Sequence, residues 1–115
     1  MAGSIREILL EAGRPTVAEA RRRLAGELDL ARRRGDLVLK VIHGYGSTGV
    51  GGALRDAVRS SLRRRAKEGR IRAFLAAEKI ESHGEACRLL LDACPRLARD
   101  RDFIDHNDGV TFVLL

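Results

Sequence analysis

Aromatic residues are nearly absent from this sequence, which has no tryptophan, one tyrosine and three phenylalanines among its 115 residues. The core must therefore consist mainly of Leu, Val, Ile and Ala, and the apolar content of 44 % predicts a folded chain. The two cysteines, Cys87 and Cys94, provide neither a disulfide framework nor a metal-type pair. No apolar run approaches the ~20 residues of a membrane span, and no signal-peptide core is present. We expect one domain, residues 1–115, located in the cytoplasm and away from membranes.

Acidic residues are scarce in the first two-thirds of the chain. Residues 1–72 carry 17 Lys and Arg against 8 Asp and Glu, whereas residues 73–115 carry 5 against 8. Arginine supplies 19 of the 22 basic residues, and its planar guanidinium suits phosphate contacts. This asymmetry predicts a surface that binds a polyanion. The alternative is a GC-rich coding bias, which favours Arg and Ala over Lys whatever the partner.

The spacing of apolar residues predicts alternating strands and helices. A capping box at residues 16–19 opens a first helix that Gly35 ends, and a second helix is expected over residues 53–67. Another capping box at residues 82–85 opens a third helix that Pro95 closes. The expected strands are residues 5–12, 37–42, 71–76 and 109–115. The order β-α-β-α-β, with an extra helix and a final strand, predicts a layered α/β fold.

A glycine-rich loop, HGYGSTGVGG, joins the second expected strand to the second expected helix. Its G-x-G-x-x-G spacing is a weak signal for a dinucleotide, because only Glu68 lies near the expected acidic position and little chain remains for a larger sheet. A P-loop is excluded because no Gly-Lys-Ser/Thr follows. Glycines do let backbone amides approach an anion, and the next helix adds partial positive charge. The alternative is a tight turn without a ligand.

Several side chains around this loop could contact an anionic ligand. His43, at the end of the strand, is expected to face the ligand and has a near-neutral pKa suited to acid–base chemistry. Tyr45 offers a ring for stacking or a phenol for hydrogen bonding. Arg55 and Arg59 on the next helix, in an outward row with Arg63, are expected to reach phosphates.

The stretch VIHGYGSTGVGGALRDAV resembles the signature of the Smr (small MutS-related) domain, in which a strand ends in H-G-x-G before a helix bearing Leu and Arg. TVAEA and DGVTFVLL resemble the first helix and the closing G-x-T-x-V-x-L strand of that family. The resemblance covers residues 5–76 and 107–115, and the segment 77–106 departs from it. It implies a two-layer α/β sandwich with a four-stranded mixed sheet, similar to the C-terminal domain of translation initiation factor three.

The resemblance also implies nucleic-acid binding and, in many members, endonuclease or nicking activity. The implied nucleic-acid contacts are His43, Gly44, Tyr45, Gly46, Ser47, Thr48, Gly49, Arg55 and Arg59. A second family motif, L-D-x-H-G after the first strand, is missing, and Glu11 stands at its Asp or its His position depending on the alignment. Glu11 is expected to act as a base with His43, or to hold the His43 ring in one tautomer.

Three functions remain open from the sequence. The first is binding of RNA or DNA without cleavage, the second is metal-independent cleavage by His43 and Glu11, and the third is protein interaction with a glycine loop that has lost its ligand. No metal site is predicted, because His43, His83 and His106 show no recognised ligand spacing. No cofactor is predicted either. A ribosome or another nucleic-acid-processing factor is the expected partner for directing the domain.

Overall fold

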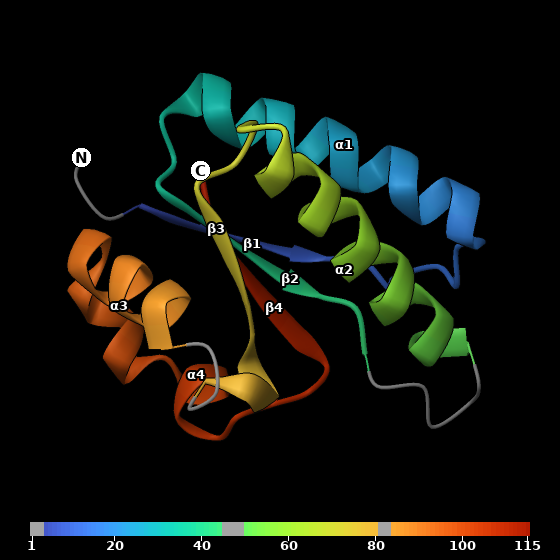
Figure 1. The fold of residues 1–115 in the computed structure, drawn as a ribbon. Coiled ribbons are helices and arrows are strands. Elements are labelled where there is room, and N and C mark those ends of the chain that lie inside the picture. Colours follow the sequence, from blue (N-terminus) through green and yellow to red (C-terminus); the bar gives the residue numbers. More distant parts are fainter. Residues whose placement is uncertain (1–3, 45–49, 81–83) are drawn as a thin grey trace.

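The computed structural model describes residues 4–44, 50–80 and 84–115 and shows a mixed sheet with helices packed against it (Figure 1). The four strands are β1 (Ile5–Leu9), β2 (Val38–Ile42), β3 (Ala73–Ala76) and β4 (Val110–Leu114). The helices are α1 (Val17–Arg34), α2 (Val50–Lys67), α3 (Gly84–Ala93) and α4 (Arg101–Ile104), with short 3-10 helices η1 (Ala77–Lys79) and η2 (Pro95–Arg99). The predicted α/β class and four-stranded mixed sheet are confirmed.

The sheet has the strand order β1-β2-β4-β3. β1 and β2 are parallel, with Ile5 opposite Val38, and α1 makes the crossover that a parallel pair requires. β4 runs antiparallel to both of its neighbours, β2 and β3. The last strand of the chain therefore lies inside the sheet, where it meets the end of β2.

Local sequence signals fix the limits of α1. Thr16 accepts a hydrogen bond from the Glu19 backbone at 3.1 Å, and Glu19 accepts one from the Thr16 backbone at 2.9 Å. These hydrogen bonds with Thr16 lower the pKa of Glu19. At the other end Gly35 has φ 76°, a left-handed conformation that glycine adopts without a Cβ penalty. The predicted capping box and helix end are both confirmed.

Helices cover both faces of the sheet, which corrects the two-layer expectation. On one face, α1 and α2 pack against Leu39 and Val41 of β2. On the other, α3, η2 and α4 pack against Val38 and Phe112, and Leu90 of α3 is fully buried there. The segment 77–106 therefore adds a third layer (Figure 1). β2 has no alternating polar positions because both of its faces are covered.

Lys40 of β2 ties this third layer to the sheet. Its ammonium lies 3.0 Å from Asp100 and 2.7 Å from Asp102, and its side chain is 7 % exposed. Burial disfavours the charged form of Lys40, but hydrogen bonds to Asp102 and Asp100 outweigh it and raise the pKa. Asp100 is also the N-cap of α4, which follows η2 directly in the chain.

Two strand limits differ from prediction by more than one residue, since β1 ends at Leu9 and β3 begins at Ala73. Among the described residues, no helix is both long enough and apolar enough to cross a membrane.

Candidate functional site

The end of β2 is fastened to the start of β4. The backbone amides of His43 and Gly44 both donate to the carbonyl of Gly109, at 2.9 and 3.1 Å. The Gly109 amide in turn donates to Asn107 at 2.9 Å. The strand end and the turn before β4 therefore form one hydrogen-bonded unit, which fixes the direction in which the chain leaves β2.

The His43 ring is fully buried, which corrects the expectation that it faces a ligand. Nδ1 lies 2.8 Å from the Gly44 carbonyl oxygen, and Nε2 lies 2.9 Å from the Thr111 hydroxyl. A carbonyl can only accept, so Nδ1 carries the proton and Nε2 accepts from Thr111. Burial lowers the pKa of His43 to about 4, so the ring is neutral at pH 7. Gly44 and Thr111, rather than Glu11, set the tautomer.

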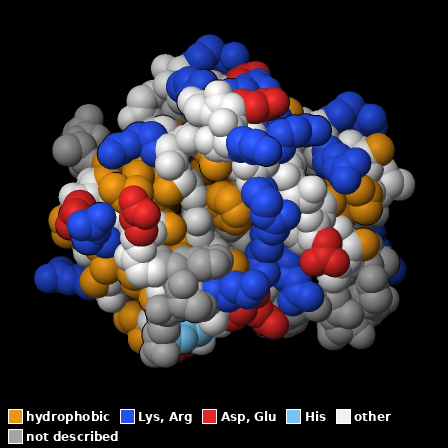
Figure 2. Space-filling model, viewed as in Figure 1, with side chains coloured by type: hydrophobic (Ala, Val, Ile, Leu, Met, Phe, Trp, Pro, Cys, Tyr) orange, Lys and Arg blue, Asp and Glu red, His pale blue; other side chains and the backbone are white. Residues whose placement is uncertain are grey.

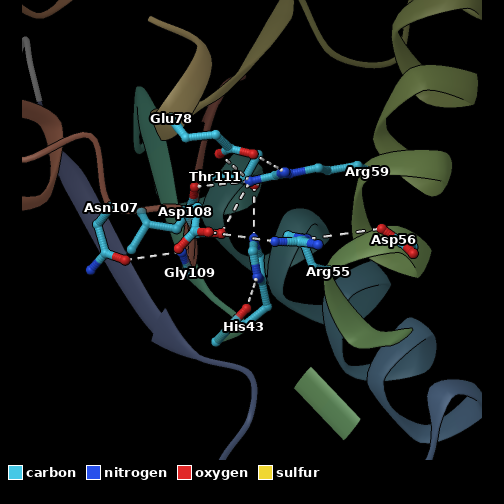
Figure 3. Close-up of polar contacts among 11 residues, drawn as sticks. His43, Arg55, Asp56, Arg59, Glu78, Asn107, Asp108, Gly109 and Thr111 are labelled. Atoms are coloured by element: carbon cyan, nitrogen blue, oxygen red, sulfur yellow. Dashed lines mark hydrogen bonds and ion pairs between the residues drawn. The ribbon is translucent and has the colours of Figure 1, made fainter. Parts of the chain in front are cut away.

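Arg59 completes this network from α2 (Figure 3). Its Nε donates to the Thr111 hydroxyl at 3.1 Å, so that hydroxyl accepts from Arg59 and donates to His43. The Arg59 guanidinium also forms a bidentate pair with Glu78, at 2.6 and 2.8 Å. Burial would raise the pKa of Glu78, but its hydrogen bonds to Arg59 lower it. Arg59 is therefore held over the end of the sheet rather than pointing outward as predicted.

The neighbouring arginines of α2 are held more loosely. Arg55 lies 3.7 Å from Asp108 and 3.9 Å from Asp56, and its side chain is 28 % exposed (Figure 3). Arg63 is exposed and forms no ion pair within the described part of the chain. Arg55 and Arg63 therefore have the freedom to contact an anion that Arg59 lacks.

Glu11 lies against the start of the glycine loop. Gly44 has φ 80°, and a Cβ built on it would overlap Oε2 of Glu11 and lie 3.3 Å from Cδ. Arg23 donates to the carbonyls of Leu10 and Ala12 on either side of Glu11, at 3.0 and 2.9 Å. The backbone around this exposed carboxylate is thus fixed, and the predicted proximity of Glu11 to the H-G-x-G motif is present in the structure.

Part of the predicted site falls outside the described residues, namely Tyr45, Gly46, Ser47, Thr48 and Gly49. Their contacts with a ligand stay predictions. Among the residues that are described, no group of three or more His, Cys, Asp or Glu is arranged to hold a metal ion.

Thr111 and Glu78 were not predicted as members of this site, although the sequence carries one signal for Thr111. Side chains alternate along a strand, so Leu39, Val41 and His43 share a face, and Thr111 is opposite Val41. Thr111 is also the one polar residue of β4. The pattern therefore indicated a buried polar pair between His43 and β4, whereas Glu78 follows β3 and carries no such signal.

The arrangement separates a rigid part from an accessible part. His43, Thr111, Arg59 and Glu78 form a connected, largely buried network that fixes Gly44. Arg55 and Arg63 supply accessible positive charge beside it, and Glu11 supplies an accessible carboxylate. Cations beside a fixed backbone suit an anionic ligand, and a carboxylate is able to accept a proton from a nucleophile.

Comparisons with known proteins agree with the resemblance. A family model of the Smr domain matches residues 13–92. Among solved structures, the chain is similar to the crystal structure of the Smr domain of MutS2 from Thermus thermophilus. The two share 29 % sequence identity over 96 % of each chain, with a TM-score of 0.60. A search of curated proteins found no match.

Proposed function

Since this chain belongs to the Smr domain family, we propose that it binds nucleic acid by its phosphate backbone, through the H-G-x-G loop and the Arg-bearing helix α2. The family is one of domains that bind nucleic acids or nick them. The observation that carries the proposal is the position of Arg55 and Arg63. Arg55 lies beside the end of β2 and Arg63 about two turns further along α2, and neither forms a close ion pair with another described residue.

In this proposal Arg59 and His43 are positioning residues. Arg59 is committed to Glu78 and Thr111, and His43 uses both ring nitrogens within the protein. Their role is to hold the Gly44 carbonyl, and with it the start of the loop, in one orientation. The ligand then contacts backbone amides of the loop together with Arg55 and Arg63.

Charge reversal tests the proposal directly. Fluorescence anisotropy with labelled RNA and DNA oligonucleotides at low salt is expected to show binding that falls about tenfold in Arg55→Glu and in Arg63→Glu. Arg33→Glu is the matched control, because Arg33 is exposed on α1 and α2 lies between α1 and β3 (Figure 1). Equal losses in all three variants would indicate a net-charge effect and contradict a site on α2.

Cleavage is a second candidate function, and the position of Glu11 favours it. An exposed carboxylate beside Gly44 is placed to take a proton from an attacking hydroxyl, while the buried His43 ring holds the carbonyl of Gly44. Incubation with labelled RNA and DNA, with and without EDTA, would show metal-independent products. Glu11→Gln should abolish these products and leave binding within about twofold. Products that persist in Glu11→Gln would exclude Glu11 as the base.

The remaining candidate is a protein-interaction domain, which is supported if no nucleic acid binds at low salt. The proposed partner that delivers the domain to its nucleic acid is a ribosome or another nucleic-acid-processing factor, and the proposed location is the cytoplasm.

A further inference from the structure

β3 is an edge strand of the sheet, and a groove runs beside it between α2 and α3. The groove has a volume of about 680 Å³ and is lined by residues of α2, β3, η1 and the first half of α3. In the space-filling view, arginine side chains border an apolar area in this region (Figure 2). The groove is separate from the buried His43 network. Arg59 is the one described lining residue that also belongs to that network.

The walls of the groove are cationic. Arg59, Arg63, Arg72 and Lys79 line it, and Glu85 is the one carboxylate among its described lining residues. Arg63 and Arg72 are exposed, and neither forms an ion pair with another described residue. Two accessible guanidinium groups, Arg63 on α2 and Arg72 just before β3, thus favour an anionic occupant.

The floor of the groove is apolar. Phe74 of β3 is half-buried and lines the groove together with Ala73, Ala76 and Leu89. A small anion gains nothing from such a floor. A chain that combines phosphates with flat, unpaired bases uses both the walls and the floor, because bases stack on aromatic rings and phosphates pair with arginine.

The groove continues toward the candidate site. A second hollow of about 440 Å³ shares Arg59, Arg63 and Lys79 with the first and extends to Arg55. At a rise of 1.5 Å per residue, the eight residues from Arg55 to Arg63 cover about 12 Å of α2. A bound strand is therefore able to pass from the end of β2 along α2 to the edge of β3.

We propose that the nucleic acid bound by this domain is single-stranded and lies in this groove, with its backbone at Arg63 and Arg72 and a base against Phe74. The proposal rests on the proposed function and adds the class of nucleic acid. A duplex keeps its bases paired and stacked inside and would leave the apolar floor unused. A single strand exposes its bases and fills the groove.

The test compares a labelled 12-nucleotide single strand with the blunt duplex of the same sequence, as RNA and as DNA, at one salt concentration. The single strand is expected to bind at least tenfold more tightly. Arg72→Glu and Phe74→Leu should each weaken single-strand binding about tenfold and leave duplex binding within twofold. Both variants are expected to fold, because Phe74→Leu keeps an apolar side chain and Arg72 is exposed. If one of them fails to fold, the other still tests the groove.

Several outcomes would overturn the inference. Equal binding of duplex and single strand, or wild-type single-strand binding by both variants, contradicts the groove while leaving nucleic-acid binding intact. A decaglutamate peptide that competes as well as the oligonucleotide would assign the groove to acidic peptides instead. Absence of binding by either form at low salt contradicts the proposed function itself, and the inference falls with it.

Discussion

The imidazole of His43 is hydrogen-bonded to the hydroxyl of Thr111, with 2.9 Å between Nε2 and Oγ1, although 68 residues separate them in the sequence. The same hydroxyl accepts from Arg59 of α2. One threonine therefore connects β2, which leads into the H-G-x-G motif, with β4 and with the arginine-bearing helix α2. Because the hydroxyl has one proton, the direction of both hydrogen bonds is determined.

Replacing Thr111 by Val should destabilise the protein by about 1–3 kcal/mol, because Nε2 of His43 and Nε of Arg59 lose their shared partner in a buried position. Thr111→Ser is the control, since it keeps the hydroxyl and loses one methyl group. Urea denaturation at pH 7 measures both. A Val variant no less stable than the Ser variant would show that the hydroxyl does not hold the network together.

Stability should fall as the pH is lowered from 7 to 5. The pKa of His43 is depressed in the folded state to about 4, from 6.5 in the unfolded chain, so the unfolded state binds the proton first. The stabilising contribution is complete above pH 6.5 and decreases below it, by about 2 kcal/mol at pH 5. The lowered pKa of Glu78 acts only below its ordinary value of 4.5 and leaves this window unaffected.

His43→Gln provides the comparison for this pH dependence. The variant lacks the titrating ring, so its free energy of unfolding should change much less between pH 7 and pH 5. Parallel pH profiles of the variant and the wild-type protein would contradict a neutral, buried His43.

Gly44→Ala should cost about 1 kcal/mol, because an L side chain is strained at φ 80°. The new Cβ overlaps only the carboxylate end of Glu11, an exposed and flexible side chain that is free to turn away. Gly35→Ala is the matched control, since Gly35 has φ 76° and nothing within 4 Å of a built Cβ. Equal losses for the two variants are expected in denaturation experiments, and a far larger loss at Gly44 would show that Glu11 is rigidly held.

Lys40→Met should destabilise the protein by about 3 kcal/mol, because Asp100 and Asp102 lose the cation that compensates them. Adding Asp100→Asn and Asp102→Asn to this variant should recover part of the loss, since no unpaired charge then remains. Glu7→Gln is the control: Glu7 is mostly exposed and 3.4 Å from Lys40, so its removal should cost less than about 1 kcal/mol. Thermal unfolding of the four proteins checks this, and a triple variant no more stable than Lys40→Met would contradict the cluster.

The parts of the fold that were predicted correctly depend on neighbours in sequence. The Thr16 capping box and the Gly35 helix end both follow from residues that are close in the sequence to the helix ends they form. The Smr resemblance is confirmed for the same reason, since its motif is a contiguous stretch.

The features that were predicted wrongly depend on distant partners. His43 was expected to face a ligand because it lies at the end of its strand, but the ring is buried and hydrogen-bonded to Thr111 of β4. Arg59 was expected to point outward because it lies four residues from Arg55 and Arg63. Instead its guanidinium pairs with Glu78, which follows β3 in the chain. The third layer was missed because Lys40 in β2 gives no sign, in sequence, that Asp100 is its partner.

The salt dependence of nucleic-acid binding tests the central claim most directly. The logarithm of the binding constant for a single-stranded oligonucleotide should fall linearly with the logarithm of salt concentration in the wild-type protein. In Arg63→Gln the binding should weaken across all sequences, and the slope should decrease in magnitude by about one unit, which corresponds to one lost phosphate contact. A slope unchanged in Arg63→Gln, or near zero in the wild-type protein, would contradict recognition of the phosphate backbone by α2.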